Sequence, residues 1–186
     1  MVAYNGSDKD IGLAAKQGRI RNAVNTITNV KHVLGRRIED PLIKQKMKEG
    51  PAKIKDKNGF PIFEVDFKEK PLIVTPKEAA TLIFKKLKDI ASHQGGSGND
   101  KDVVLTAPSS YTSKQRALLC QSAREAGFKV LRIISEASAA TLAYGLCDTK
   151  SVDKSNVLVF RLGGTSMCTS ILQVSSGMLR VLASQT

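Results

Sequence analysis

The sequence predicts an α/β fold, because apolar segments of strand length alternate with segments of helical pattern. Residues 130–134 form an apolar, largely β-branched run interrupted only by Arg132, and residues 156–160 read Asn-Val-Leu-Val-Phe, as expected for a buried strand. The segment 75–78 combines a threonine N-cap, a proline at the first helical position and a capping-box glutamate. Strands and helices therefore follow one another along the chain, as in a sheet flanked by helices.

The N-terminal part is predicted to be mainly helical. Apolar residues at helical spacing predict helices over 9–19, 22–34 and 39–47, although Gly12 and Gly18 weaken the first. A dense lysine run follows up to residue 57, and Asn58-Gly59 then favours a hairpin turn.

The remaining elements alternate more regularly. Thr75 and Thr112 are typical N-caps, and Gly127 and Gly145 are typical C-terminal stops. In chain order we expect strands over 62–67 and 72–74, a helix to about residue 92 with Ala79, Leu82, Ile83, Leu87 and Ile90 inward, a strand over 102–106, a helix over 112–127, a strand over 130–134, a helix over 137–144, and strands over 156–160, 169–174 and 178–182.

Composition narrows the class of protein. The 186 residues carry 29 basic and 17 acidic side chains, a net charge of +12, which favours polyanionic partners or a lysine-rich surface. No apolar run approaches 18 residues, so no membrane span or membrane partner is expected, and the N-terminus does not resemble a secretory signal. Three scattered cysteines and two histidines predict reduced thiols in the cytosol and no zinc site.

Glu136 stands where a predicted strand meets a predicted helix. Ser135 occupies the N-cap position, so Glu136 falls in the first helical turn. Open α/β sheets hold ligands at the carboxyl ends of their strands, which makes this carboxylate a candidate site residue. The alternative is that Glu136 only complements the helix dipole.

A second candidate is the glycine-containing segment 162–166, Leu-Gly-Gly-Thr-Ser, between two predicted strands. Glycines let the backbone approach a ligand closely, and successive amide groups can cradle a phosphate. The segment matches neither GxxxxGK[ST] nor GxGxxG, so taken alone it is better explained as a hairpin turn.

Four segments together carry a more specific pattern. They are Asn25–Arg36, Val103–Arg116, Val130–Ala140 and Asn156–Ser166. In order, spacing and flanking residues they resemble the nucleotide-binding domain of the heat shock protein 70 family, and the resemblance covers essentially the whole chain. Details at 11–17, 163–166 and 177–183 are similar to a divergent cytosolic subgroup that works with a ribosome-bound J-domain protein.

This resemblance implies roles for eight residues. Lys31 falls on the lysine that positions the attacking water and the γ-phosphate, although it could also be a dipole-complementing helix end. Glu136 falls on the carboxylate that reaches Mg²⁺ through water. A phosphate-binding loop is implied at Gly163, Gly164, Thr165 and Ser166. Pro108 and Arg116 fall on the pair that relays nucleotide state between domains.

The chain also departs from the family pattern. Arg161 and Cys168 stand where the family has aspartates, Thr165 replaces a third glycine, and Ala137 replaces a proline. The first of those aspartates serves the metal and the attacking water in phosphoryl transfer. An arginine cannot be that ligand, so whether the chain acts as an enzyme is left open, with hydrolysis expected to be impaired.

The resemblance implies an actin-like ATPase fold of the ribonuclease H-like kind. We expect residues 1–186 to form an incomplete first lobe with a mixed sheet and a smaller inserted subdomain over 36–99, because the family's first phosphate loop and second lobe find no counterpart. A fragment, a truncated gene model and a splice product are all consistent with this.

The implied function is that of a cytosolic chaperone ATPase domain that uses ATP and Mg²⁺ in protein folding. The implied partners are a J-domain co-chaperone, the ribosome or a nascent chain, and unfolded polypeptide held by a missing domain. Three alternatives remain: a non-enzymatic module for the ribosome or the J-domain partner, a basic RNA-binding module, and an actin-like sugar kinase. The lysine and glutamate contexts favour the chaperone over the kinase.

Overall fold

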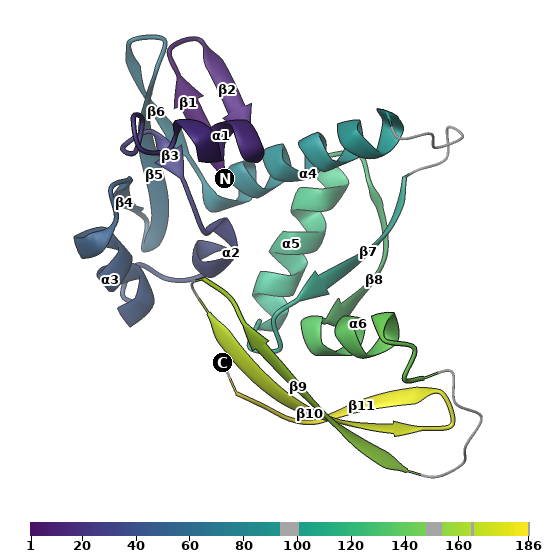
Figure 1. Cartoon of the computed structure of the whole chain (residues 1–186). Coiled ribbons are helices and arrows are strands. Elements are labelled where there is room, and N and C mark those ends of the chain that lie inside the picture. The colour runs from purple at the N-terminus through teal and green to yellow at the C-terminus, as the bar shows by residue number, and fades with distance from the viewer. Residues whose placement is uncertain (94–100, 148–153, 165, 186) are drawn as a thin grey trace. The chain divides into compact units, whose positions relative to one another are not determined.

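The computed structural model confirms an α/β chain and describes residues 1–93, 101–147, 154–164 and 166–185 (Figure 1). The chain divides into two compact units. Unit 1 comprises residues 1–103 and 117–130, and unit 2 comprises residues 104–116 and 131–186. The predicted subdomain over 36–99 stays a prediction.

Unit 1 holds two three-stranded sheets with strand orders β2-β1-β3 and β4-β5-β6. Its core contains fully buried side chains from several elements, including Val2, Ile27, Ile43 and Val65. The elements are β1 (Val2–Asn5), β2 (Asp8–Ile11), α1 (Leu13–Gly18), β3 (Thr26–Ile27), α2 (Val30–Val33), α3 (Pro41–Glu49), β4 (Lys53–Lys57), β5 (Phe60–Phe67), β6 (Lys70–Val74) and α4 (Pro76–His93).

Two helix predictions in unit 1 are wrong. Residues 8–11 form the strand β2, which pairs with β1, so that the first helix is reduced to α1. The predicted helix over 22–34 contains the strand β3, which pairs with β1 and is fully buried. Only α2 remains helical, and it begins after Asn29, whose φ of 52° is left-handed. Pairing with a distant strand therefore overrides local helical spacing here.

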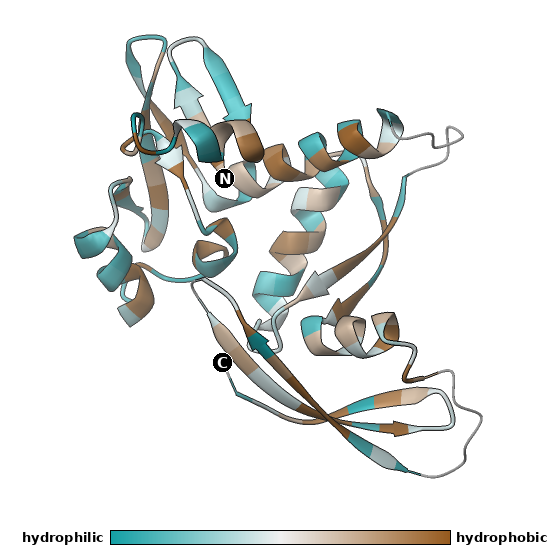
Figure 2. Ribbon diagram, viewed as in Figure 1, coloured by the Kyte–Doolittle hydropathy of each residue, from teal (hydrophilic) through white to brown (hydrophobic). Residues whose placement is uncertain are grey.

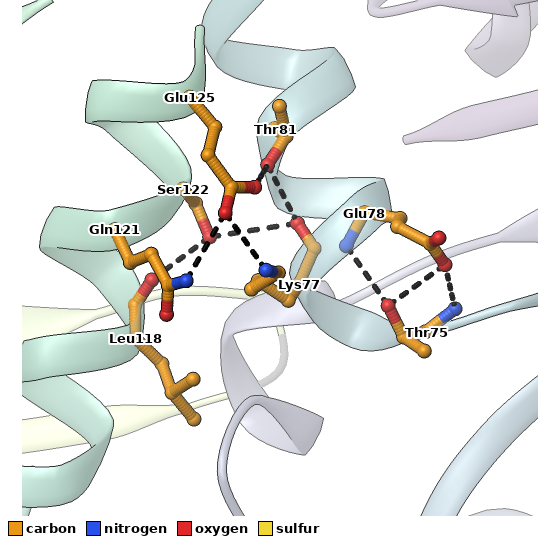
Figure 3. Close-up of polar contacts among 8 residues, drawn as sticks. All are labelled: Thr75, Lys77, Glu78, Thr81, Leu118, Gln121, Ser122 and Glu125. Atoms are coloured by element: carbon orange, nitrogen blue, oxygen red, sulfur yellow. Dashed lines mark hydrogen bonds and ion pairs between the residues drawn. The ribbon is translucent and has the colours of Figure 1, made fainter.

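The helix α4 begins as the sequence predicts. The Thr75 hydroxyl accepts a hydrogen bond from the Glu78 amide at 3.1 Å, and the Glu78 carboxylate accepts one from the Thr75 amide at 2.7 Å (Figure 3). This is the reciprocal capping box. The predicted inward positions hold only for the first half of the helix, because Leu87 and Ile90 are exposed.

The helices α4 and α5 (Ser113–Glu125) are joined by a polar network around Glu125 (Figure 3). Its carboxylate forms an ion pair with Lys77 at 2.8 Å and accepts a hydrogen bond from Gln121 at 3.1 Å. The Ser122 hydroxyl, which is fully buried, lies 3.4 Å from the Lys77 carbonyl and donates to the Leu118 carbonyl at 2.9 Å. These contacts stabilise the packing of the two helices.

Acidic pH should weaken the packing between α4 and α5. The hydrogen bond from Lys77 is the main cause that lowers the pKa of Glu125 below its usual value of 4.5. A lowered folded-state pKa stabilises the fold above that usual value, and the stabilisation is lost as the pH falls through the folded-state pKa. In Glu125→Gln the unfolding free energy should therefore decrease less steeply than in wild type as the pH falls below 4.5. Urea denaturation over a pH series measures this dependence.

The control for this prediction is Glu39→Gln, which removes an exposed glutamate before α3. Some acid dependence should persist in Glu125→Gln, because Lys55 also lowers the pKa of Glu64. An unchanged pH profile in Glu125→Gln, or the same flattening in Glu39→Gln, would contradict a role for the Glu125 network.

Unit 2 contains a helix packed on an antiparallel sheet. The helix α6 (Glu136–Ala143) packs on β9 (Ser155–Leu162) and β10 (Met167–Ser175), and β11 (Met178–Gln185) completes the sheet in the order β11-β10-β9. Leu172 and Val174 of β10 are buried on one face. The other face exposes apolar side chains, and brown segments run along these strands in Figure 2.

The strands β7 (Asp102–Ala107) and β8 (Lys129–Ser135) form a two-stranded sheet, and α5 connects them along the chain. The described strands thus pair in four groups, whereas the predicted lobe has one mixed sheet in addition to its inserted subdomain. Tight turns at Gly6, Gly59 and Gly177, all with positive φ, pair each strand with its chain neighbour. Across the described residues, none of the helices combines the length and apolarity that a membrane crossing requires.

Candidate functional site

The junction between β8 and α6 places Glu136 as predicted. Ser135 has an extended conformation, and its hydroxyl accepts a hydrogen bond from the Ser138 amide at 2.9 Å. Glu136 is consequently the first residue of α6, directly after the strand. This cap fixes the start of the helix and with it the position of the Glu136 carboxylate.

The glycine segment is the turn of the β9–β10 hairpin. Leu162 pairs with Met167, and the Gly163 amide donates a hydrogen bond to the Ser166 carbonyl at 2.9 Å. A Cβ atom on Gly163 would lie 3.3 Å from that carbonyl, whereas one on Gly164 would meet open space. Thr165 lies outside the described residues. The turn is thus tight at Gly163 and accessible at Gly164.

Arg161 of β9 and Glu136 of α6 form an ion pair. An Nη atom of Arg161 lies 2.8 Å from a carboxylate oxygen of Glu136. Both side chains are partly buried, with 38% of Arg161 and 21% of Glu136 exposed. The arginine therefore places a positive charge directly beside the carboxylate.

Cys168 lies directly opposite Arg161. The two are partners in the β9–β10 register, so that their side chains share one face of the sheet. Cys168 is buried, and its sulfur lies 3.6 Å from the Ser170 hydroxyl and 3.7 Å from that of Ser184. The two positions at which the resemblance predicts a departure from aspartates are therefore neighbours.

Lys31 belongs to unit 1, whereas Glu136 and the glycine turn belong to unit 2. Lys31 is an exposed residue in the last turn of α2. Its assigned role toward a γ-phosphate stays a prediction.

Pro108 and Arg116 lie together in unit 2. Arg116 in the first turn of α5 donates hydrogen bonds to the carbonyls of Tyr111 at 3.3 Å and Pro108 at 3.5 Å. The arginine thus holds the segment that leads from β7 into α5. Whether this contact relays nucleotide state stays a prediction.

Comparison with known proteins decides the family. The family model described as "Hsp70 protein" matches residues 1–186. The chain belongs to the Hsp70 family. Over 100% of its length it is 46% identical to "Heat shock 70 kDa protein 14" of Danio rerio and 45% identical to the proteins of that name of Bos taurus and Homo sapiens. It covers 37%, 36% and 36% of those three proteins, respectively.

Membership of the Hsp70 family confirms the predicted actin-like ATPase fold. It also confirms the family resemblance that the four segments indicated. The divergent subgroup that the details at 11–17, 163–166 and 177–183 resemble is member fourteen of the family, which agrees with the relatives' name. The Hsp70 chain spans little more than a third of the length of these relatives.

The residues around Glu136 do not fit a magnesium ion. Mg²⁺ needs oxygen ligands in near-octahedral geometry, whereas a guanidinium lies against this carboxylate and a thiol faces that guanidinium across the hairpin. Within residues 1–93, 101–147, 154–164 and 166–185, no group of three or more His, Cys, Asp or Glu side chains is placed to hold a metal. The guanidinium of Arg161 is cationic and 38% exposed, which suits an anionic ligand better than a metal ion.

Sequence reasoning identified Arg161 as a departure but missed its contact with Glu136. The sequence could have indicated which face of the hairpin Arg161 lies on, since closing the hairpin between Gly163 and Ser166 sets Arg161 opposite Cys168. The approach of α6 to the end of β9 depends on how the helix packs on the sheet, which no local pattern reports.

Proposed function

We propose that this chain is part of the nucleotide-binding domain of a cytosolic chaperone that binds ATP with little or no hydrolysis and assists the folding of new polypeptides. Membership of the Hsp70 family supports the chaperone class. The ion pair between Arg161 and Glu136 carries the proposal of lost hydrolysis.

Hydrolysis of ATP by this fold depends on carboxylates that hold a metal ion and orient the attacking water. Here Arg161 binds the Glu136 carboxylate, which withdraws that carboxylate from such a role. The same guanidinium can bind phosphate oxygens, and the accessible backbone at Gly164 lies three residues further along the hairpin. The arrangement therefore favours retention of the nucleotide over its turnover.

The proposed partners are a J-domain co-chaperone, the ribosome with its nascent chain, and unfolded polypeptide bound by a further domain. The net charge of +12 supports work beside ribosomal RNA. The ion pair also supports a second candidate, a non-enzymatic module that binds the J-domain partner or the ribosome, since such a module needs no hydrolytic site.

The test is an NMR titration of the 186-residue chain with ATP, adenosine and inorganic tripolyphosphate. ATP and tripolyphosphate should shift the amide signals of Gly163, Gly164 and Ser166, and adenosine should not. We expect a Kd of about 1 mM, because a few charge-assisted hydrogen bonds of about 1.5–3 kcal/mol each must offset association costs of about 4–15 kcal/mol. ADP should not accumulate.

Two results would overturn the proposal. One is the absence of ATP-dependent shifts in the hairpin turn, and the other is brisk formation of ADP by the chain. A titration with single-stranded RNA separates the RNA-binding alternative. That alternative predicts a strongly salt-dependent affinity with shifts at the lysines of α3 and β4 instead of the hairpin.

A further inference from the structure

The guanidinium of Arg161 lies directly against Glu136, the carboxylate that the family resemblance links to a metal ion through water. The arginine comes from the penultimate residue of β9, and the glutamate is the first residue of α6. Their charged atoms are 2.8 Å apart, so that no water separates them. A positive charge is thus already supplied to this carboxylate by the chain itself.

The surroundings of Arg161 offer little to a competing metal ion. Its cross-strand neighbour Cys168 is buried and lies within 3.7 Å of two serine hydroxyls, so the nearest side chain of β10 adds no carboxylate. A divalent cation beside Glu136 would meet the guanidinium charge at short range and be repelled. The local charge therefore disfavours Mg²⁺ and leaves anions as the ligands that fit.

We infer that Arg161 is a built-in substitute for magnesium, and that this site binds the polyphosphate of a nucleotide directly through its guanidinium without a divalent cation. The inference rests on the proposed nucleotide-binding function. A guanidinium has five N–H donors in a planar fork, and the ion pair engages one Nη atom. With 38% of the side chain exposed, further donors remain accessible to phosphate oxygens.

This arrangement reverses the usual response to chelation. A site that binds a metal–nucleotide complex loses affinity when the metal is removed. A site that uses an arginine binds the free nucleotide at least as well, because free ATP carries more negative charge than its magnesium complex. Nucleotide binding would then not require magnesium.

The first experiment measures metal binding without any nucleotide. Mn²⁺ is titrated into the 186-residue chain, and paramagnetic broadening of the amide signals of Glu136 and Ala137 is followed by NMR. Wild type should show no selective broadening at these signals. Arg161→Asp should acquire it, because two carboxylates then face one another where one ion pair stood.

Arg180→Asp on β11 is the matched control, since it makes the same charge change in the same sheet but two strands away from Arg161. It should behave as wild type does. Arg161→Gln provides a neutral variant in case the aspartate disturbs folding, and unchanged amide signals elsewhere in β9–β11 verify the fold. Selective broadening in wild type would overturn the inference.

The second experiment compares tripolyphosphate and ATP binding in EDTA and in excess Mg²⁺. Wild type should bind equally well or more tightly in EDTA. Arg161→Gln should weaken binding about tenfold or more, whereas Arg180→Gln should not. Binding that requires Mg²⁺ would overturn the inference while leaving the proposed function intact. The absence of ATP binding in both buffers would instead overturn the proposed function, and the Mn²⁺ titration would still test whether Arg161 replaces the metal.

Discussion

Leu172→Ala should destabilise unit 2 by about 2–5 kcal/mol, the usual loss for a fully buried leucine. Leu172 has no exposed surface and lies in the central strand of the β9–β11 sheet, between Val157 and Val181 in the register. The truncation leaves a cavity that the two flanking strands cannot close without breaking their pairing. Urea denaturation followed by circular dichroism measures the loss, and hydrogen exchange locates it in β9–β11.

Leu158→Ala is the matched control in the neighbouring strand. Leu158 is 66% exposed on the opposite face of the same sheet. Its truncation should change the unfolding free energy by about 0.5 kcal/mol or less. Equal losses in the two variants would mean that the buried face of this sheet does not hold unit 2 together.

The sequence predicts the fold well where a local pattern decides the structure. The cap of α4 at Thr75, the hairpin turn at Asn58-Gly59 and the strand-to-helix junction at Ser135 are confirmed because each depends on a few neighbouring residues. The helix predicted over 22–34 is wrong because Thr26 and Ile27 pair with β1, a contact between distant parts of the chain. Helical spacing cannot report such pairing.

In the candidate site, too, the sequence predicts the local features but not the contacts between distant residues. The positions of Glu136 at a helix start and of Gly163 in a turn follow from the sequence and are confirmed as local structure. The contact between Arg161 and Glu136 does not follow, because it depends on the packing of α6 against β9. The family resemblance therefore predicts that Arg161 replaces a carboxylate, and the structure shows that this arginine pairs with Glu136.

The exposed apolar face of the β9–β11 sheet should make the isolated chain self-associate. Leu158, Phe160 and Leu162 alternate along the edge strand β9 and are 59–73% exposed, and Met167 and Ile171 of β10 are register partners of Leu162 and Leu158. Edge strands with apolar side chains are templates for pairing with another chain. Full burial of each such side chain contributes about 1.5–3 kcal/mol, so even half-burial of two promotes association.

Phe160→Thr combined with Leu162→Thr should weaken this association about tenfold or more, since it removes two apolar groups and keeps residues that favour a strand. Sedimentation velocity over a concentration series measures the change. The control is Leu13→Gln combined with Ile20→Gln, which removes two exposed apolar side chains from unit 1. A wild-type chain that stays monomeric at high concentration, or a control that dissociates the assemblies equally, would show that this sheet face does not drive association.

Because Arg161 lies between the two substituted residues and points to the other face, the variant should keep its ion pair with Glu136.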